Sequence, residues 1–235
     1  MSRTLSYEAA RRVYDRIGSR QDSQAFYEDR PVDLLVAHAD FHLSRRVIEL
    51  GCGTGRFALR LLSEELPADA GYIGVDISPE MVRLSRDKLA RFGERAKVRL
   101  SKGDIRFEDG DASCDRFVSS YVLDLLSEND IRLAVAEAHR ILEPGGLLCL
   151  VSLATGAGTA SRVLASGWSR LHALAPELVG GCRPIDLLDH LGPDRWIIRY
   201  QERVAPFAVP SEIVVAERIS PAAAGALTGE LAGVG

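Results

Sequence analysis

The stretch Val47–Ala58, VIELGCGTGRFA, places three glycines two residues apart between a short apolar run and a helical pattern. Glycine lets the backbone turn sharply and lets a ligand approach the main chain closely. The spacing of Gly51, Gly53 and Gly55 differs by one residue from the G-x-G-x-x-G fingerprint of dinucleotide-binding loops. Glu49 would repel a pyrophosphate and would suit a cationic ligand. The stretch therefore predicts a ligand loop of another kind.

Apolar runs and helical patterns alternate on both sides of this loop. Runs typical of buried strands and patterns typical of helices follow one another along the chain: strands at 45–50, 71–76, 97–100, 115–120 and 146–153, helices at 55–66, 78–92 and 129–142. Ser78, Pro79 and Glu80 form a strong helix start. We expect Leu133, Ala134, Ala138, Ile141 and Leu142 to form the buried stripe of the third helix. Such alternation predicts parallel strands with right-handed crossovers and both sheet faces covered.

The end of the chain has a different pattern. Residues 195–204 alternate, with Trp196, Ile198 and Tyr200 expected on one face, and a second strand-like run follows Pro206 and Pro210. Two strands joined by a short proline-containing loop predict an antiparallel hairpin. We therefore predict an α/β fold: a Rossmann-like, doubly wound, mostly parallel seven-stranded sheet with an antiparallel C-terminal hairpin and helical cap segments.

Length and pattern indicate one domain over residues 1–219 of the 235-residue chain. Within it, residues 1–44 form an N-terminal helical cap and residues 155–192 a helical insert. Residues 220–235 are low in complexity and are expected to be a flexible tail.

Composition excludes several classes of protein. The chain is 46% hydrophobic and 26% charged, with a formal net charge of −4 and no basic cluster, so a nucleic-acid partner is not expected. No signal peptide or transmembrane run is visible. The cysteines lie far apart, without metal-ligand spacing: Cys52, Cys114, Cys149 and Cys182. We predict a cytoplasmic protein without disulfides or a metal site.

The ligand that best suits a glycine loop preceded by a carboxylate is S-adenosylmethionine, because it carries an α-ammonium and a sulfonium. Four segments, VIELGCGTGRFA, GVDISPEMV, KGDIRFED and EAHRILEPGGLLCLVSL, together resemble class I S-adenosylmethionine-dependent methyltransferases. The group that they resemble includes the ubiquinone and menaquinone biosynthesis C-methyltransferases. The resemblance covers about residues 44–155, and the hairpin extends it toward residue 219.

The resemblance implies a role for each matching residue in binding S-adenosylmethionine, with S-adenosylhomocysteine as the product. Asp76 would accept hydrogen bonds from the ribose hydroxyls, and Asp104 one from the adenine amine. The other cofactor residues would contact the adenine or the methionine part, or close over the ligand: Tyr14, Glu49, Gly51, Cys52, Gly53, Ile77, Met81, Ile105, Ser119 and Ser120. Asp76 and Asp104 could instead be turn residues, and Met81 a core residue.

Tyr121 and Asp124 follow the fourth strand and would lie nearest the transferred methyl group. Asp124 could equally cap a helix. His172 and His190, in the insert, are candidate bases that could also be surface or packing residues. Arg183 would clamp an anionic substrate or brace a carboxylate within the insert. Tyr27, like Tyr14, would close over the cofactor or pack in the core.

We expect the acceptor to be a small, partly hydrophobic molecule. The Asn/Asp-Pro-Pro-aromatic stretch and the Pro-Cys nucleophile of nucleic-acid methyltransferases are absent from the sequence. Peripheral contact with a membrane stays open, and the sequence does not indicate the oligomeric state or the methylated atom. Two alternatives remain: a non-catalytic cofactor-binding subunit and a nicotinamide-dependent oxidoreductase.

Overall fold

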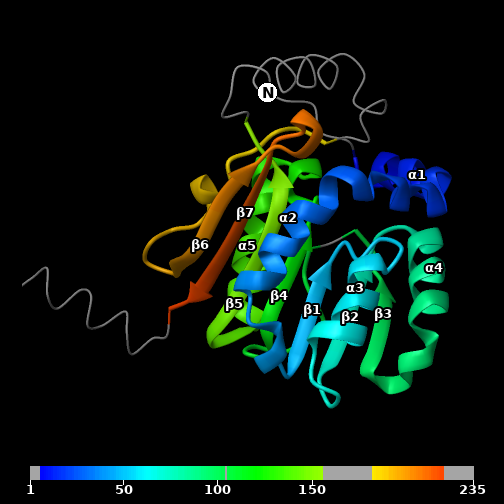
Figure 1. Cartoon of the computed structure of the whole chain (residues 1–235), viewed down its shortest axis with the longest axis horizontal. Coiled ribbons are helices and arrows are strands. Elements are labelled where there is room, and N and C mark those ends of the chain that lie inside the picture. The colour runs from blue at the N-terminus through cyan, green and yellow to red at the C-terminus, as the bar shows by residue number, and fades with distance from the viewer. Residues whose placement is uncertain (1–5, 104, 156–181, 220–235) are drawn as a thin grey trace, which may run out of the picture.

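The computed structural model describes residues 6–103, 105–155 and 182–219; the side chains of residues 24 and 25 are outside the description. A seven-stranded sheet in the order β3-β2-β1-β4-β5-β7-β6 forms its centre (Figure 1). The strands are Arg46–Leu50 (β1), Gly71–Asp76 (β2), Ala96–Leu100 (β3), Cys114–Ser120 (β4), Leu142–Leu153 (β5), Trp196–Val204 (β6) and Ser211–Arg218 (β7). The strands β1 to β5 are parallel, and β7 pairs antiparallel with both β5 and β6. The predicted sheet and its hairpin are confirmed.

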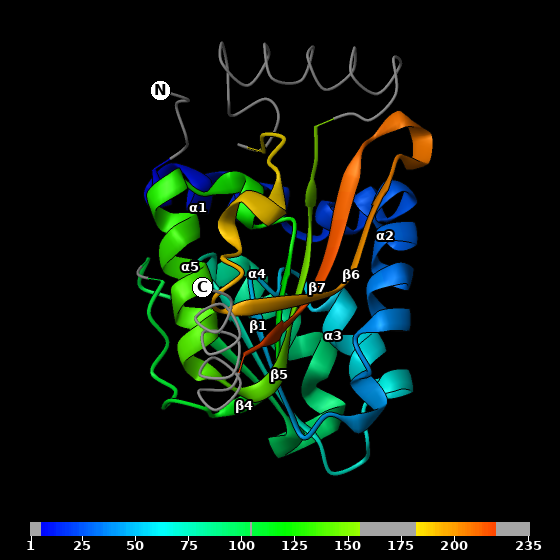
Figure 2. The ribbon, with the colours of Figure 1, turned by 90° about the vertical axis from the view of Figure 1, so that its left-hand side faces the viewer.

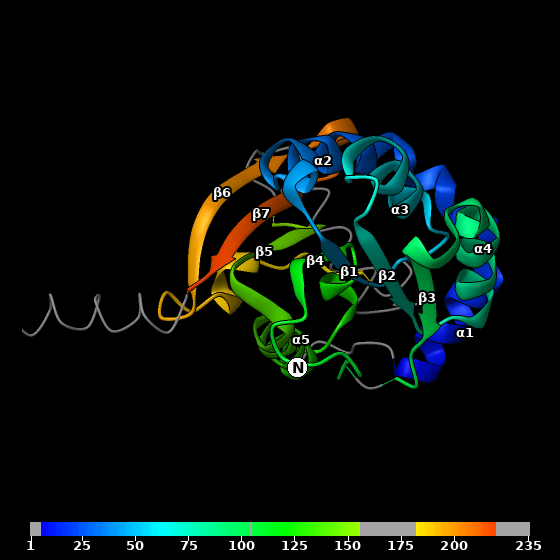
Figure 3. The ribbon, with the colours of Figure 1, turned by 90° about the horizontal axis from the view of Figure 1, so that it is seen from below.

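Helices cover both faces of the sheet, as Figure 3 shows. The helices are Tyr7–Ile17 (α1), Ala25–His38 (α2), Arg56–Arg60 (α3), Pro79–Leu89 (α4) and Glu128–Ile141 (α5). Apolar side chains of α2, α3 and α4 pack on one face, together with Val47 and Tyr72 from the strands. Those of α5 pack on the other face against Ile48, Phe117 and Leu148. Alternate residues of a strand therefore serve two separate cores.

The start of α4 agrees with the sequence pattern. Ser78 is its N-cap and accepts a hydrogen bond from the Met81 amide at 3.1 Å, with Pro79 at the first turn. The helix after β1 differs from the expectation, because α3 ends at Arg60 and continues as a π-helical turn over Leu61–Glu65.

Three details of packing correct the prediction. Leu133 is 52% exposed, and the buried face of α5 is made by Ile131, Ala134, Val135, Ala138 and Ile141. Ile198 is exposed as well, and a register shift between Ile198 and Tyr200 turns Tyr200 to the face of β6 opposite Trp196, so the three side chains do not share one face. The fifth strand begins at Leu142 rather than Gly146, with a second register shift opposite Cys114–Arg116.

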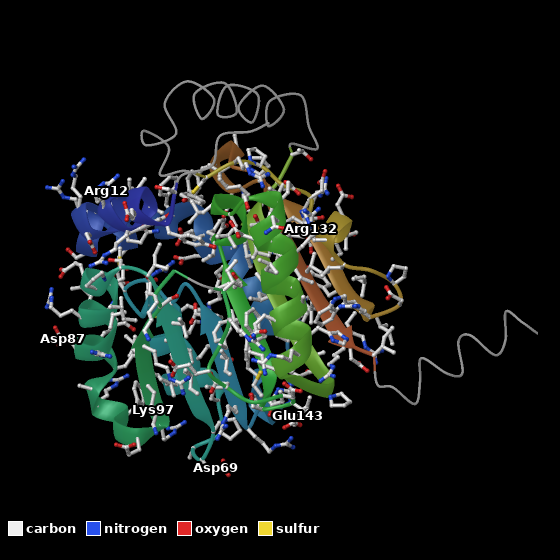
Figure 4. All side chains as sticks on the ribbon, turned by 180° about the vertical axis from the view of Figure 1, so that it is seen from behind. Arg12, Asp69, Asp87, Lys97, Arg132 and Glu143 are labelled. Atoms are coloured by element: carbon white, nitrogen blue, oxygen red, sulfur yellow. The ribbon has the colours of Figure 1, made fainter. Side chains whose placement is uncertain are left out.

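The N-terminal cap lies at the end of the molecule where the parallel strands end. Figure 1 shows α1 across the carboxyl ends of the strands, and α2 runs down one face of the sheet. In Figure 4, Arg12 and Arg132 mark this end, whereas Asp69 and Glu143 mark the opposite end. The predicted insert lies largely outside the described residues, and the predicted tail lies wholly outside them.

Candidate functional site

The glycine loop between β1 and α3 has a backbone that favours glycine. Gly51, Gly53 and Gly55 have φ angles of 75°, 52° and 77°, in the left-handed region. A Cβ atom on Gly51 would lie 2.2 Å from Cγ2 of Val122, so no larger residue fits without displacing the segment after β4. The Gly51 amide donates to the Val75 carbonyl at 2.7 Å, which holds the loop against the end of β2.

Asp76 joins this loop to the start of α4. Its Oδ2 accepts a hydrogen bond from the Gly53 amide at 2.9 Å, and its Oδ1 accepts one from the Ser78 amide at 2.9 Å. Burial raises the pKa of Asp76, whereas these backbone hydrogen bonds act in the opposite direction. The carboxylate is thus fixed between the ends of β1 and β2, with lone pairs left for a ligand.

A cavity of about 420 Å³ opens beside this carboxylate, between the strand ends and α1. The charged side chains on the described part of its wall are two carboxylates, Asp76 and Asp130. The wall therefore favours a ligand with net positive charge. Many of the residues predicted for the site line the cavity: Tyr14, Gly51, Gly53, Asp76, Ile77, Ile105, Ser120 and Tyr121.

Glu49 lies beneath the glycine loop and is not on the cavity wall. It is 2% exposed and accepts a hydrogen bond from the Tyr72 hydroxyl at 2.5 Å. Burial, with a smaller contribution from Asp76, raises the pKa of Glu49 to about 7. The carboxyl group is therefore not placed for the predicted direct contact with the cofactor.

Three other predicted cofactor residues turn away from the cavity. The Met81 side chain is 1% exposed, in the core under α4. Cys52 is buried with its Sγ 4.0 Å from the Ser85 hydroxyl. Ser119 is buried too, and its Oγ has no hydrogen-bond partner among the described residues. Asp104 and His172 lie outside the described residues and stay predictions.

Several lining residues were not predicted. Tyr7 and Gln21 come from the N-terminal segment, for which the sequence carries no local signal. For Asp130, by contrast, the sequence does carry a local signal. Ser127 caps α5, accepting from the Asp130 amide at 3.2 Å and donating to its carboxylate at 2.7 Å, and this Ser-x-x-acid pattern is typical of a helix start.

Polar contacts hold the N-terminal cap onto the cofactor loop and α4. Asp15 accepts a hydrogen bond from the Ser78 hydroxyl at 2.6 Å. Asp22 accepts one from the Thr54 hydroxyl at 2.5 Å and pairs with Lys88 at 3.0 Å. Farther along, Arg56 pairs with Glu28 and Asp29. These contacts place Tyr14 and Gln21 over the cavity.

Asp124 lies deep at the other side of the site. It is fully buried in a 3-10 turn, Leu123–Leu125, and the N-cap of α5 is Ser127, so the capping alternative is wrong. Its Oδ2 accepts a long hydrogen bond, 3.4 Å, from the Leu153 amide, and its Oδ1 has no hydrogen-bond partner among the described residues. Burial raises the pKa of Asp124 to about 7.

Tyr121 connects the cavity to α2 and to the C-terminal hairpin. Its backbone is held at a φ of 54°, which is uncommon for a residue other than glycine. Its hydroxyl lies 2.9 Å from the Ser211 hydroxyl, and its ring meets that of Tyr27 edge-on, with centroids 5.8 Å apart. Burial raises the pKa of both tyrosines, so both stay neutral.

Arg183 and His190 have structural contacts. The Arg183 guanidinium donates to the Leu126 carbonyl and pairs with Glu128, both at 2.9 Å. His190 Nε2 lies 3.8 Å from the same carboxylate. Arg183 therefore braces a carboxylate, but this carboxylate lies at the start of α5 and not in the insert as predicted.

The described residues contain no group of three metal-ligating side chains. Cys52, Cys114 and Cys149 are buried and Cys182 is half-buried, and no disulfide joins any two of the described residues. Among the described helices, none combines the length and the apolar character needed to cross a bilayer.

Comparison with known proteins agrees with this geometry. Residues 47–146 match a family model described as a methyltransferase domain. A carboxy-S-adenosyl-L-methionine synthase of Chromohalobacter salexigens is 33% identical over 117 residues, 49% of this chain and 43% of that protein. A ubiquinone/menaquinone biosynthesis C-methyltransferase UbiE of Geobacter sp. is 30% identical over 115 residues, 47% and 46% of the two chains. The matched segment belongs to the class I S-adenosylmethionine-dependent methyltransferases.

Solved structures show the same fold over most of the chain. The [4+2]-cyclase SpnF superposes with a TM-score of 0.72 at 16% identity, covering 92% of this chain and 98% of its own. The N-methyltransferase NodS from Bradyrhizobium japonicum, solved with S-adenosyl-L-homocysteine, has a TM-score of 0.67 at 15% identity, covering 91% and 98%. The chain spans less than half of the length of the two sequence relatives named above. The family's cofactor is S-adenosylmethionine.

Proposed function

We propose that this protein transfers a methyl group from S-adenosylmethionine to a small, partly hydrophobic acceptor. The observation that carries the proposal is the junction of Asp76 with the Gly51–Gly53 backbone on the wall of one cavity. That junction lies at the carboxyl ends of β1 and β2, where open α/β sheets bind their ligands.

The residues of the cavity fit this cofactor. A Cβ atom added to Gly53 would meet nothing within 4 Å, so the backbone there is open to close approach by a ligand. Ile77 and Ile105 supply apolar surface on the wall, suited to adenine, while Asp76 has acceptor capacity for the ribose hydroxyls. Asp104 stays our candidate for the adenine amine.

The methionine part would lie over the end of β4. There Ser120 and Tyr121 line the cavity beside Gly51, and the Ser120 carbonyl is our candidate acceptor for the ammonium. Tyr14, from α1, would exclude water from above. Glu49 would act at one remove, since its buried carboxyl group is separated from the ligand by the loop.

When bound, S-adenosylmethionine supplies the methyl group and leaves as a neutral thioether. The task of the protein is then to hold the acceptor in line with the methyl carbon and to exclude water. We assign the positioning of the acceptor to Tyr121. We assign to Asp124 the acceptance of a proton from an acceptor that must lose one, because its Oδ1 has no hydrogen-bond partner among the described residues and burial raises its pKa to about 7. Asp124 is buried behind the described cavity wall, to which its neighbours Tyr121 and Leu125 belong. His172 stays a second candidate base.

The test is calorimetric titration with S-adenosylmethionine and S-adenosylhomocysteine, with NAD and NADP as controls. We expect both adenosyl ligands to bind to the wild-type protein. Asp76→Ala should weaken binding by at least tenfold, as is typical of the loss of a charged hydrogen-bonding group. Asp87→Ala is the matched control, because Asp87 points outward from α4 and is 69% exposed (Figure 4).

The outcomes separate the proposal from its alternatives. Binding of NAD in preference to the adenosyl ligands would favour an oxidoreductase. Adenosyl binding that is indifferent to Asp76→Ala would contradict the assigned site. Binding without release of S-adenosylhomocysteine across a panel of acceptors, together with a tight protein partner, would favour a non-catalytic subunit.

A further inference from the structure

Four aromatic rings run from the cavity to the surface of the molecule. Tyr121 lines the cavity and meets Tyr27 with ring centroids 5.8 Å apart. Tyr27 meets Phe26 at 5.1 Å, and Phe26 meets Phe207 at 5.3 Å. Each contact is edge-to-face, with interplanar angles from 75° to 86°. The rings come from three distant parts of the chain, so the fold brings them together.

The outer end of this row is exposed. Phe26 is 57% and Phe207 is 74% exposed, whereas the other five phenylalanines are buried or half-buried. The two exposed phenylalanines thus touch each other rather than being scattered over the surface. Scattered apolar residues need no explanation, whereas grouped ones mark binding sites.

The loop that carries Phe207 is held in an unfavourable conformation. Phe207 and Ala208 have φ angles of 51° and 64°, in the region that residues other than glycine rarely adopt. The conformation costs free energy and holds the Phe207 ring against Phe26 instead of in a core. Figure 2 shows this loop, between β6 and β7, beside the upper end of α2.

The inner end of the row belongs to the acceptor side of the site. Burial raises the pKa of the Tyr27 hydroxyl, and the nearby carboxyl groups of Glu28 and Asp124 raise it further. It therefore lies with the group in which we place the proton acceptor. The row leads away from Tyr121 toward solvent, whereas the cofactor residues Asp76, Ile77 and Ile105 lie after β2 and β3.

We propose that Tyr121, Tyr27, Phe26 and Phe207 form the wall of an acceptor track. The occupant is an uncharged apolar portion of the methyl acceptor, too long for the cavity, which lies along the rings with its far end at the surface beside Phe207. The inference rests on the proposed methyl transfer, and adds to it that the acceptor is elongated. We choose this occupant over a separate partner protein because the row of ring contacts begins at Tyr121, which lines the cavity.

The test uses the neutral aromatic fluorophore N-phenyl-1-naphthylamine as the probe, whose emission rises in apolar surroundings. It is titrated into the full-length protein saturated with S-adenosylhomocysteine, so that the cofactor cavity is filled. Phe207→Ala and Phe26→Ala should each weaken binding of the probe by about 3- to 10-fold, as expected for loss of one aromatic contact. Phe207→Tyr keeps the ring and should bind as the wild type does.

Leu43→Ala is the control for exposed apolar area, because Leu43 is 66% exposed and precedes β1 at the opposite edge of the sheet. Equal binding by the wild type and both phenylalanine variants would overturn the track, and so would an equal loss in Leu43→Ala. A probe that binds the ligand-free protein but not the protein saturated with S-adenosylhomocysteine would overturn it as well, since the probe would then occupy the cofactor cavity.

Failure of the proposed function has a different signature. Phe207→Ala and Phe26→Ala should bind S-adenosylmethionine in the calorimeter as the wild type does. If the wild-type protein binds no adenosyl ligand, the proposed methyl transfer is wrong whatever the probe does. If it binds the cofactor and the probe is insensitive to both phenylalanines, only the track is wrong.

Discussion

Substitutions in the glycine loop test the site most directly, because Gly51 is packed against Val122 whereas Gly53 faces open space. The change is Gly51→Ala. The new Cβ would lie 2.2 Å from Cγ2 and 3.3 Å from Cβ of Val122, at a φ of 75°. Gly53→Ala, two residues on, has a φ of 52° and nothing within 4 Å of the new atom.

The two substitutions share a backbone cost and differ in the steric one. A left-handed residue other than glycine costs about 1–2 kcal/mol. Forcing a methyl group into packed surroundings adds about 1–3 kcal/mol. Gly51→Ala should therefore lower the free energy of unfolding by about 2–5 kcal/mol, and Gly53→Ala by only about 1–2 kcal/mol.

Urea unfolding followed by circular dichroism measures these differences, and calorimetry measures binding of S-adenosylmethionine by the same variants. Gly53→Ala should stay stable and lose affinity by about tenfold or more, because its methyl group would enter the cavity. Gly145→Ala is the control, with a φ of 79° and open space around the new atom, at the amino end of β5. It should show the backbone cost and bind the cofactor normally.

Adding Val122→Ala to Gly51→Ala removes both methyl groups of the obstructing side chain. The two substitutions should be coupled by about 1–2 kcal/mol in a double-mutant cycle. Equal destabilisation by Gly51→Ala and Gly53→Ala would refute this reasoning, as would the absence of any coupling to Val122.

Two further predictions concern charges. Glu49 has a pKa near 7 in the folded protein, against an ordinary 4.5. The folded state therefore binds more protons than the unfolded state between these values. As the pH rises from about 4.5 to about 7, the free energy of unfolding should fall by on the order of 3 kcal/mol. Urea unfolding across this range should show a smaller fall for Glu49→Gln; a free energy that rises instead would reverse the assignment. Asp22→Ala, which removes the contacts with Thr54 and Lys88, should cost about 1 kcal/mol and make the segment 6–24 more susceptible to proteolysis, with Asp87→Ala as the control. Unchanged cleavage would show that other contacts hold the cap.

The number and direction of the strands followed from the sequence because each strand and helix carries its own local signal. Alternating apolar runs fix parallel pairing, and Ser78 with Pro79 marks the start of α4. Gly51, Gly53 and Asp76 could be placed at one sheet edge from the same alternation. Their meeting on one cavity wall therefore needed no contact outside β1 and β2.

The details that failed depend on contacts between distant segments. Whether Leu133 or Val135 faces the core is decided by how α5 crosses the sheet, since both lie at the border of the apolar stripe. Tyr200 lies on the face opposite Trp196 because of a register shift in β6 that the sequence of one strand does not reveal. The partners of the cap carboxylates Asp15 and Asp22 lie 32 to 66 residues away in the chain, so their contacts had no local signal.

The antiparallel direction of β7 places a loop at the cofactor edge of the sheet that is separate from the cofactor-binding strands. Because β7 runs against its neighbours, the loop over residues 205–210 returns to the edge where β1, β2 and β4 end. That loop connects β6 and β7, whereas Asp76 is the last residue of β2. Length and sequence in residues 205–210 can therefore change during evolution while the Asp76–Gly53 junction stays intact. On the proposed function, such changes would alter the choice of acceptor and leave the cofactor site as it is.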